Sequence, residues 1–170
     1  MPSKDTDTIT TKETAAVEES ESYQSEQALA NSYDTGSIDR SVFDQILEMD
    51  DDEERDFSRT IVFGFMEQAE QSFKDMEDSL KGKDLAQLSS LGHFLKGSSA
   101  TLGLVKVQDY CEKIQNLGSD PDKTRTTNAD DREERLAGIT SVLGEMKEEY
   151  KCVCVRFRKF YDDLNGDSQL

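Results

Sequence analysis

The sequence predicts an all-α fold, an antiparallel up-down-up-down four-helix bundle with a short additional N-terminal helix. Apolar residues recur at steps of three and four in five segments, and no segment alternates apolar and polar residues over a strand's length. The last segment carries an a/d heptad pattern, which requires neighbouring helices lying nearly parallel to it. Tryptophan is absent and there are only two prolines, a composition typical of helical proteins. Four apolar faces joined by short links are best satisfied by a bundle.

The chain divides into a tail and one domain. Its 170 residues suffice for one ordinary domain with its own core. Residues 1–36 are rich in Ser, Thr, Glu and Asp and show no apolar periodicity, which predicts a disordered acidic tail. The helical domain is predicted over residues 37–166.

The first two helices follow from capping residues and apolar spacing. Ser37 or Asp39 can cap a short helix that we expect to lie across one end of the bundle. The acidic run at residues 50–54 fits the amino terminus of the second helix, because unpaired N–H groups there favour negative charge. The apolar stripe of this second helix comprises Phe57, Ile61, Val62, Phe65, Met66, Ala69, Phe73, Met76 and Leu80.

The remaining helices are separated by clear breaks. Gly82 ends the second helix and Asp84 caps the third, which runs to about Thr101. The fourth runs from Leu104 to Leu117, and residues 118–131 are a loop by composition. The heptad positions of the last helix are Leu136, Ile139, Leu143, Met146, Tyr150, Val153, Phe157, Phe160 and Leu164.

Charge and cysteine usage exclude several classes of function. The formal net charge of −17 opposes binding to nucleic acid or to anionic lipid. No stretch approaches the ~20 apolar residues of a bilayer crossing, and the amino terminus lacks a secretory signal pattern, so we expect a protein of the cytoplasm and nucleus. Three cysteines make no disulfide framework. Cys152 and Cys154 differ by about 200° around a helix, so they cannot bind one metal ion together, and buried or half-buried thiols are expected.

His93, the only histidine, is the candidate reactive residue. On a helical wheel it lies about 150° from the centre of the leucine-rich face of the third helix, so it points away from the core. Gly97, one turn later, costs a helix about 1 kcal/mol relative to Ala, which suggests that another molecule approaches closely there. Lys96 can bring its ammonium group over the same surface. The other neighbours of His93 on the wheel are also small: Ala86, Ser89, Ser90 and Ala100.

These residues favour phosphoryl transfer over other chemistry. A water-exposed imidazole is largely neutral and nucleophilic at cellular pH, and a nearby cation offsets the charge that a phosphoryl group brings. A second His or a paired Cys for a metal site is lacking, as are a nucleophile elbow and a P-loop. Two alternatives remain open: the histidine is incidental, or the chain is a non-catalytic acidic helical adaptor.

The run HFLKGSSATLG resembles the phosphorylation-site motif of histidine-containing phosphotransfer (HPt) domains, whose core is His-x-x-Lys-Gly. MDDDEERDFS and CEKIQNLG also resemble the fungal members that act in the osmosensing multistep phosphorelay. The similarity covers roughly residues 38–118 and, more loosely, the last helix. It implies a phosphocarrier that takes a phosphoryl group from a receiver-domain aspartate of a hybrid sensor kinase and passes it to a response-regulator aspartate.

The resemblance also implies roles for individual residues. His93 would be the phosphoacceptor, Lys96 would steady the phosphoryl group, and Gly97 would keep the imidazole reachable. Gln115 would lie against the histidine and orient it. The histidine phosphotransferase would have no ATP-dependent kinase activity and no cofactor of its own, because magnesium belongs to the receiver. We expect a monomer.

The family docks receivers on an apolar patch beside the histidine. The matching positions are Val42, Ile46, Met49, Phe57, Ile61 and Phe94. Phe94 also falls outside the leucine arc on the wheel, which indicates an exposed aromatic ring. For Val42, Ile46, Phe57 and Ile61, burial in the bundle core is an equally good interpretation.

Overall fold

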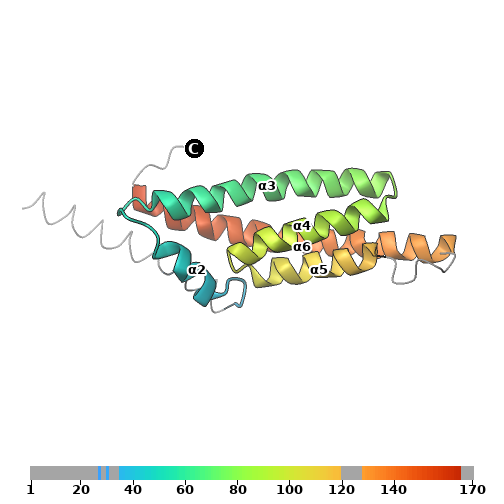
Figure 1. Cartoon of the computed structure of the whole chain (residues 1–170), viewed down its shortest axis with the longest axis horizontal. Helices are drawn as coiled ribbons and strands as arrows, with labels where there is room; N and C mark the ends of the chain where they lie inside the picture. The colour runs from blue at the N-terminus through green and yellow to red at the C-terminus, as the bar shows by residue number, and fades with distance from the viewer. Residues whose placement is uncertain (1–26, 28–29, 31–34, 120–127, 166–170) are drawn as a thin grey trace, which may run out of the picture.

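The computed structural model describes residues 35–119 and 128–165, together with residues 27 and 30. It contains the short helix α2 (Arg40–Leu47) and four longer helices, α3 (Asp56–Lys81), α4 (Leu85–Thr101), α5 (Val105–Gly118) and α6 (Ala129–Asn165). The four long helices run alternately in opposite directions, and α2 lies at the end of the bundle where α3 begins and α6 ends (Figure 1). The predicted all-α bundle is confirmed.

Helix boundaries follow from local capping chemistry. The Asp39 carboxylate accepts hydrogen bonds from the Ser41 hydroxyl and from the Ser41 backbone N–H at the start of α2, and both bonds lower its pKa. The Asp84 carboxylate accepts the backbone N–H of Gln87 at the start of α4, and Gly82 ends α3 as expected. These caps confirm the breaks that the sequence indicated.

Two predicted boundaries were wrong. Residues 50–55 form a loop, and α3 begins only at Asp56, because Arg55 takes a left-handed backbone conformation with φ 52°. The predicted loop at 118–131 is shorter at both ends, since Gly118 completes α5 and α6 begins at Ala129. Asp130 and Asp131 stabilise the first turn of α6, where the helix dipole favours negative charge.

The predicted tail, residues 1–36, falls almost entirely outside the described residues. No helix among the described residues is long and apolar enough to cross a bilayer.

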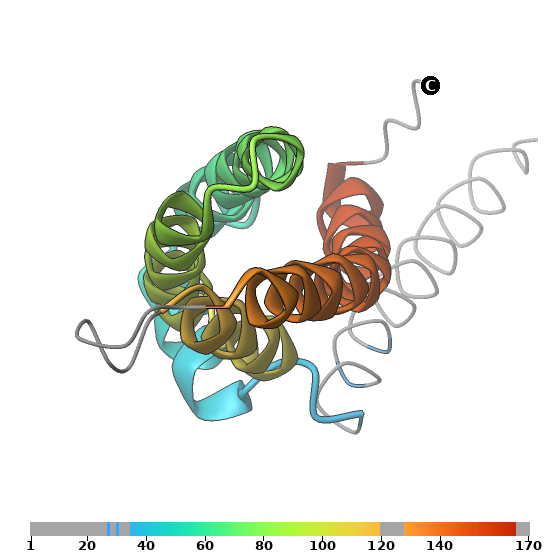
Figure 2. The same ribbon diagram turned by 90° about the vertical axis from the view of Figure 1, so that its right-hand side faces the viewer.

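Helix α6 supplies the central seam of the core. Eight of its nine predicted heptad residues are buried, from Leu136 to Phe160, and the side chain of Leu164 lies outside the described part of the chain. Figure 2 shows α3, α4, α5 and α6 in end view as a ring around the shared core. In α3, Val62, Phe65 and Met66 are buried as expected, whereas Phe57 is 42% exposed. Other buried stripe residues of α3 are Ala69, Phe73 and Met76, and Ile61 and Leu80 are partly buried.

Helix α2 is attached to the bundle at two points. The Phe43 ring is fully buried, with its centroid 5.1 Å from that of Phe157 in α6. The Asp39 N–H donates to the Gly103 carbonyl in the turn between α4 and α5 at 2.7 Å. A side chain at Gly103 would collide with Asp39, and its φ of +69° also requires glycine. Both contacts keep α2 in place beside that turn.

Candidate functional site

His93 projects from α4 into solvent. Its side chain is exposed, whereas Leu88 and Leu95 on the opposite face are fully buried. The outward orientation that the helical wheel predicted is confirmed. The apolar face of α4 anchors the helix in the bundle, so the imidazole is carried by a rigid element.

The surface around His93 is open. A Cβ atom added at Gly97 would meet nothing within 4 Å. Ala86, Ser90 and Ala100 are also exposed, and their short side chains leave the imidazole accessible. Ser89 is different, because its hydroxyl faces α5 and donates to the Gln115 carbonyl at 3.0 Å. The small residues therefore serve both access to the ring and close packing against α5.

Gln115 reaches the histidine from α5. Its amide nitrogen lies 3.3 Å from His93 Nδ1 and donates to it in the tautomer that carries the ring proton on Nε2. In the other tautomer Nδ1 carries the proton, the Gln115 amide turns over so that its oxygen accepts, and Nε2 keeps a free electron pair. Among the described residues, no hydrogen-bond partner is found at Nε2. This leaves one ring nitrogen held and the other available for reaction.

Two glycines allow Gln115 to come this close. A Cβ at Gly92 would lie 3.0 Å from the Cys111 carbonyl oxygen, and one at Gly118 would lie 2.7 Å from the Leu85 carbonyl oxygen. Both contacts are with backbone atoms of the neighbouring helix, which cannot move aside cheaply. Close approach of α4 and α5 therefore depends on glycine at both positions, one on each helix.

The carboxyl end of α5 is held from α6. Arg135 donates to the Leu117 carbonyl at 2.7 Å and to the Ser119 carbonyl at 2.6 Å. These bonds satisfy carbonyl groups that have no partner within the helix. They fix the last turn of α5, immediately after Gln115.

Lys96 is paired in the structure. Its ammonium group lies 3.0 Å from the Glu112 carboxylate on α5, with the two side chains 37% and 54% exposed. An ion pair this exposed contributes at most about 1 kcal/mol, so an arriving anion can compete for the lysine. Glu112 was not among the residues predicted from the sequence. The available signal was its position three residues before Gln115, on the same face of α5.

The predicted apolar patch is divided between surface and core. Met49, Phe57 and Phe94 are 59%, 42% and 52% exposed. Ile46 is only 8% exposed and belongs to the core, so core packing is the correct interpretation for that residue. The two remaining members, Val42 and Ile61, are partly buried.

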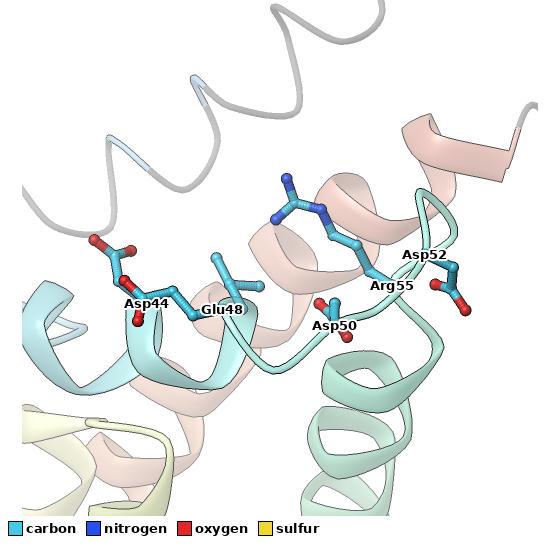
Figure 3. Close-up of a pocket in the computed structure, with 6 residues that line it drawn as sticks. Asp44, Glu48, Asp50, Asp52 and Arg55 are labelled. Atoms are coloured by element: carbon cyan, nitrogen blue, oxygen red, sulfur yellow. The ribbon is translucent and has the colours of Figure 1, made fainter.

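An acidic groove of about 440 Å³ lies between α2 and the loop before α3. Asp44 reaches it from α2 and Glu48 from the residue that follows α2, and Asp50, Asp52 and Arg55 line it from the loop (Figure 3). Two of its lining residues, Glu48 and Asp50, flank Met49 in the sequence.

Cys111 lies on α5 one turn before Gln115, and Cys152 and Cys154 lie on α6. Cys111 and Cys154 are buried, whereas Cys152 is exposed, so the expectation of a buried or half-buried thiol is confirmed for Cys154 and wrong for Cys152. Burial raises the pKa of the Cys111 thiol to about 12, so it is a protonated core residue at neutral pH. No three His, Cys, Asp or Glu side chains in the described ranges are placed to hold a metal ion.

Comparison with known proteins identifies the family. The Hpt domain matches residues 61–151. "Multistep phosphorelay regulator 1" of Schizosaccharomyces pombe is 47% identical over 125 residues, which cover 74% of this chain and 42% of that protein. "Phosphorelay intermediate protein YPD1" of Saccharomyces cerevisiae is 34% identical, over 74% of this chain and 93% of that protein. The Candida albicans protein of the same name is 49% identical, over 55% of this chain and 50% of that protein. The chain thus spans half the length or less of two of these relatives.

Solved structures agree with the sequence comparison. The S. cerevisiae protein Ypd1, crystallised with the receiver domain of its downstream response regulator Ssk1, superposes with a TM-score of 0.64 at 32% identity. The match covers 74% of this chain and 95% of Ypd1. The phosphotransfer protein MtHPt2 of Medicago truncatula has the same fold, with a TM-score of 0.70 at 20% identity over 85% of this chain and 90% of that protein. The chain therefore belongs to the Hpt domain family and is a homologue of the fungal phosphorelay intermediates.

Proposed function

We propose that this chain is a phosphorelay intermediate that accepts a phosphoryl group on His93 and passes it on. The observation that carries the proposal is the His93 imidazole, which faces solvent beside Gly97 with Nδ1 held by Gln115. The donor is a receiver-domain aspartyl phosphate of a hybrid sensor kinase, and the acceptor is a response-regulator aspartate.

The transfer needs few groups from this chain. The Nε2 electron pair attacks phosphorus, the N–P bond forms, and the bond from phosphorus to the aspartyl oxygen breaks as the carboxylate leaves. Lys96 exchanges Glu112 for the phosphoryl oxygens and offsets their charge. Magnesium, held by the receiver, supplies charge neutralisation from the partner's side.

The docking surface is the apolar patch. Met49, Phe57 and Phe94 supply its exposed part, and Val42, Ile46 and Ile61 support it from partly or fully buried positions. Exposed large apolar side chains of this kind are typical of protein interaction sites. That a relative was crystallised with a receiver domain supports a receiver as the partner here.

The phosphotransfer domain comprises residues 37–166 and acts as a monomer, in the cytoplasm and nucleus. Imaging of the tagged protein tests the compartments, and a sedimentation measurement tests the monomer.

Transfer of labelled phosphate from a phosphorylated receiver tests the function. The His93→Gln variant should keep the helical content and melting temperature of the wild type and accept no label. Glu134→Gln, an exposed change at the start of α6, is the control and should accept label at the wild-type rate. Label accepted by the His93→Gln variant would refute the proposal. Wild-type protein that binds receivers without accepting label would instead be an adaptor.

A further inference from the structure

Three buried or half-buried polar groups form a hydrogen-bonded chain at the end of the bundle beneath α2. The Tyr161 hydroxyl in α6 donates to Ser58 Oγ in α3 at 2.8 Å. Ser58 Oγ in turn donates to the Asp50 carboxylate at 2.7 Å, and the Ser58 backbone N–H donates to the same carboxylate at 2.8 Å. Tyr161 and Ser58 are fully buried, and burial raises the pKa of Tyr161 to about 12, so its hydroxyl remains a donor.

This chain of bonds replaces a conventional helix cap. Arg55, the residue that precedes α3, has no capping side-chain bond. Asp50, six residues before the helix, accepts the N–H of its third residue instead, and Figure 3 shows Asp50 above the first turn of α3. The Asp52 carboxylate likewise accepts the Asp56 N–H at 3.3 Å, and Tyr161 joins this loop to α6 through Ser58.

The bonded residues are direct neighbours of the docking patch. Asp50 follows Met49, and Ser58 follows Phe57, so the chain of bonds sets the spacing of these two exposed side chains. Arg55 extends the attachment, because its guanidinium lies 4.9 Å from the centre of the Phe160 ring in α6. The end of α6 therefore fixes the loop between Met49 and Phe57.

We propose that Tyr161 is a positioning residue for receiver docking, which acts through Ser58 and Asp50 on the placement of Met49 and Phe57. The proposal rests on the proposed function. Tyr161 is fully buried, so a docked receiver would not contact it and any effect on docking is transmitted through the loop. Its loss raises the receiver concentration needed for transfer and leaves the rate within the complex unchanged.

Tyr150 provides a matched control on the same helix. It is also buried, and its hydroxyl donates to the Met66 carbonyl at 3.0 Å, within α3 and away from the loop. Tyr150→Phe and Tyr161→Phe each remove one buried hydroxyl and should have comparable effects on melting. Only Tyr161→Phe releases the loop.

The test is the rate of phosphoryl transfer as a function of receiver concentration. For Tyr161→Phe the half-saturating concentration should rise about twofold to tenfold, the range expected for loss of one hydrogen bond, with an unchanged maximal rate. Tyr150→Phe should match the wild type in both. Equal half-saturating concentrations in the two variants would overturn the inference. Failure of the wild type to accept phosphate would instead overturn the proposed function.

Two further measurements separate positioning from loss of stability. Hydrogen exchange at the Ser58 amide should accelerate in Tyr161→Phe and not in Tyr150→Phe. Ser58→Ala should raise the half-saturating concentration similarly, and the double variant with Tyr161→Phe should add little, because both changes break one connected unit. Additive effects, or an unchanged Ser58 amide, would contradict the inference, and Ser58→Ala serves alone if Tyr161→Phe does not fold.

Discussion

The orientation and tautomer of the His93 ring depend on the side-chain amide of Gln115. The contact to Nδ1 measures 3.3 Å, at the long end for a hydrogen bond, and lies at an exposed position. Such a bond orients the ring more than it stabilises the fold. The residue is therefore expected to affect the rate of transfer and to leave melting almost unchanged.

Gln115→Ala tests this role. Loss of a hydrogen bond worth about 0.5–1.5 kcal/mol should slow transfer about twofold to tenfold at saturating receiver. A quenched time course of phosphoryl transfer from the labelled receiver measures the rate. Asn116→Ala, exposed on the same helix, is the control, and equal rates in the two variants would remove Gln115 from the site.

Cys111 links stability to pH. Its thiol is fully buried and its pKa is raised from 9.0 to about 12, mainly by desolvation. A thiol whose pKa is raised in the folded state contributes its full stabilisation below the pKa of the unfolded state. That stabilisation is lost as the pH rises from the unfolded-state pKa to the folded-state pKa. Stability should therefore fall between pH 9 and 12, by about 1.4 kcal/mol per pH unit for this group.

Urea unfolding at pH 8, 9 and 10 measures this loss. Cys111→Ala should be less stable at pH 8 and show a shallower decline above pH 9. Val107→Ala, which removes buried volume from the same helix without removing a titratable group, should be destabilised equally at each pH. A slope in Cys111→Ala as steep as in the wild type would refute the assignment.

At the scale of helices, the α4–α5 pair shows what the sequence could and could not predict. Single-helix patterns were sufficient to place His93 outward, because its orientation depends only on the periodicity of α4. The reason for glycine at 92 lies in the backbone of α5, which a wheel of one helix does not contain. The Lys96–Glu112 pair was missed for the same reason, since it joins two helices.

Substitutions at Gly97 can separate access to the His93 imidazole from the stability of α4. Because a Cβ there meets nothing, Gly97→Ala should stabilise α4 by up to about 1 kcal/mol. Gly97→Gln extends a long side chain over the imidazole, and misplacing the receiver by about 1 Å should slow transfer on the order of tenfold to a hundredfold.

Gly144 in α6 is the matched control for this pair. It is also an open helical glycine with nothing within 4 Å of an added Cβ. Gly144→Ala and Gly144→Gln should change melting as their counterparts do and leave transfer unaffected. Equal transfer rates for Gly97→Gln and Gly144→Gln would remove the argument that open space at Gly97 matters.

For the whole molecule, the fold was more predictable than the loop that completes it. The heptad seam predicted α6 over more than 25 residues, because burial of a periodic face determines a helix whatever its ends do. The loop at 50–55 was mistaken for helix, since its conformation depends on Ser58 and Tyr161, distant along the chain.

Net charge acts on the molecule as a whole. A formal charge of −17 repels itself most strongly in the compact state. Raising salt from 10 to 150 mM shortens the screening length from about 30 Å to about 8 Å and should raise the melting temperature by a few degrees. Calorimetry at pH 7 measures the shift, and a lower melting temperature at the higher salt would show that attractive ion pairs outweigh the repulsion.

The uninterrupted length of α6 ties the two ends of the molecule to one rotational phase. Its 37 residues extend about 55 Å, and about 39 Å of helix separates Arg135, which bonds the end of α5, from Tyr161, which bonds the start of α3. One residue inserted between Arg135 and Tyr161 would twist them apart by about 100°. Hence an insertion or deletion in this part of α6 would disturb either the support of the His93 imidazole or the surface that docks the receiver.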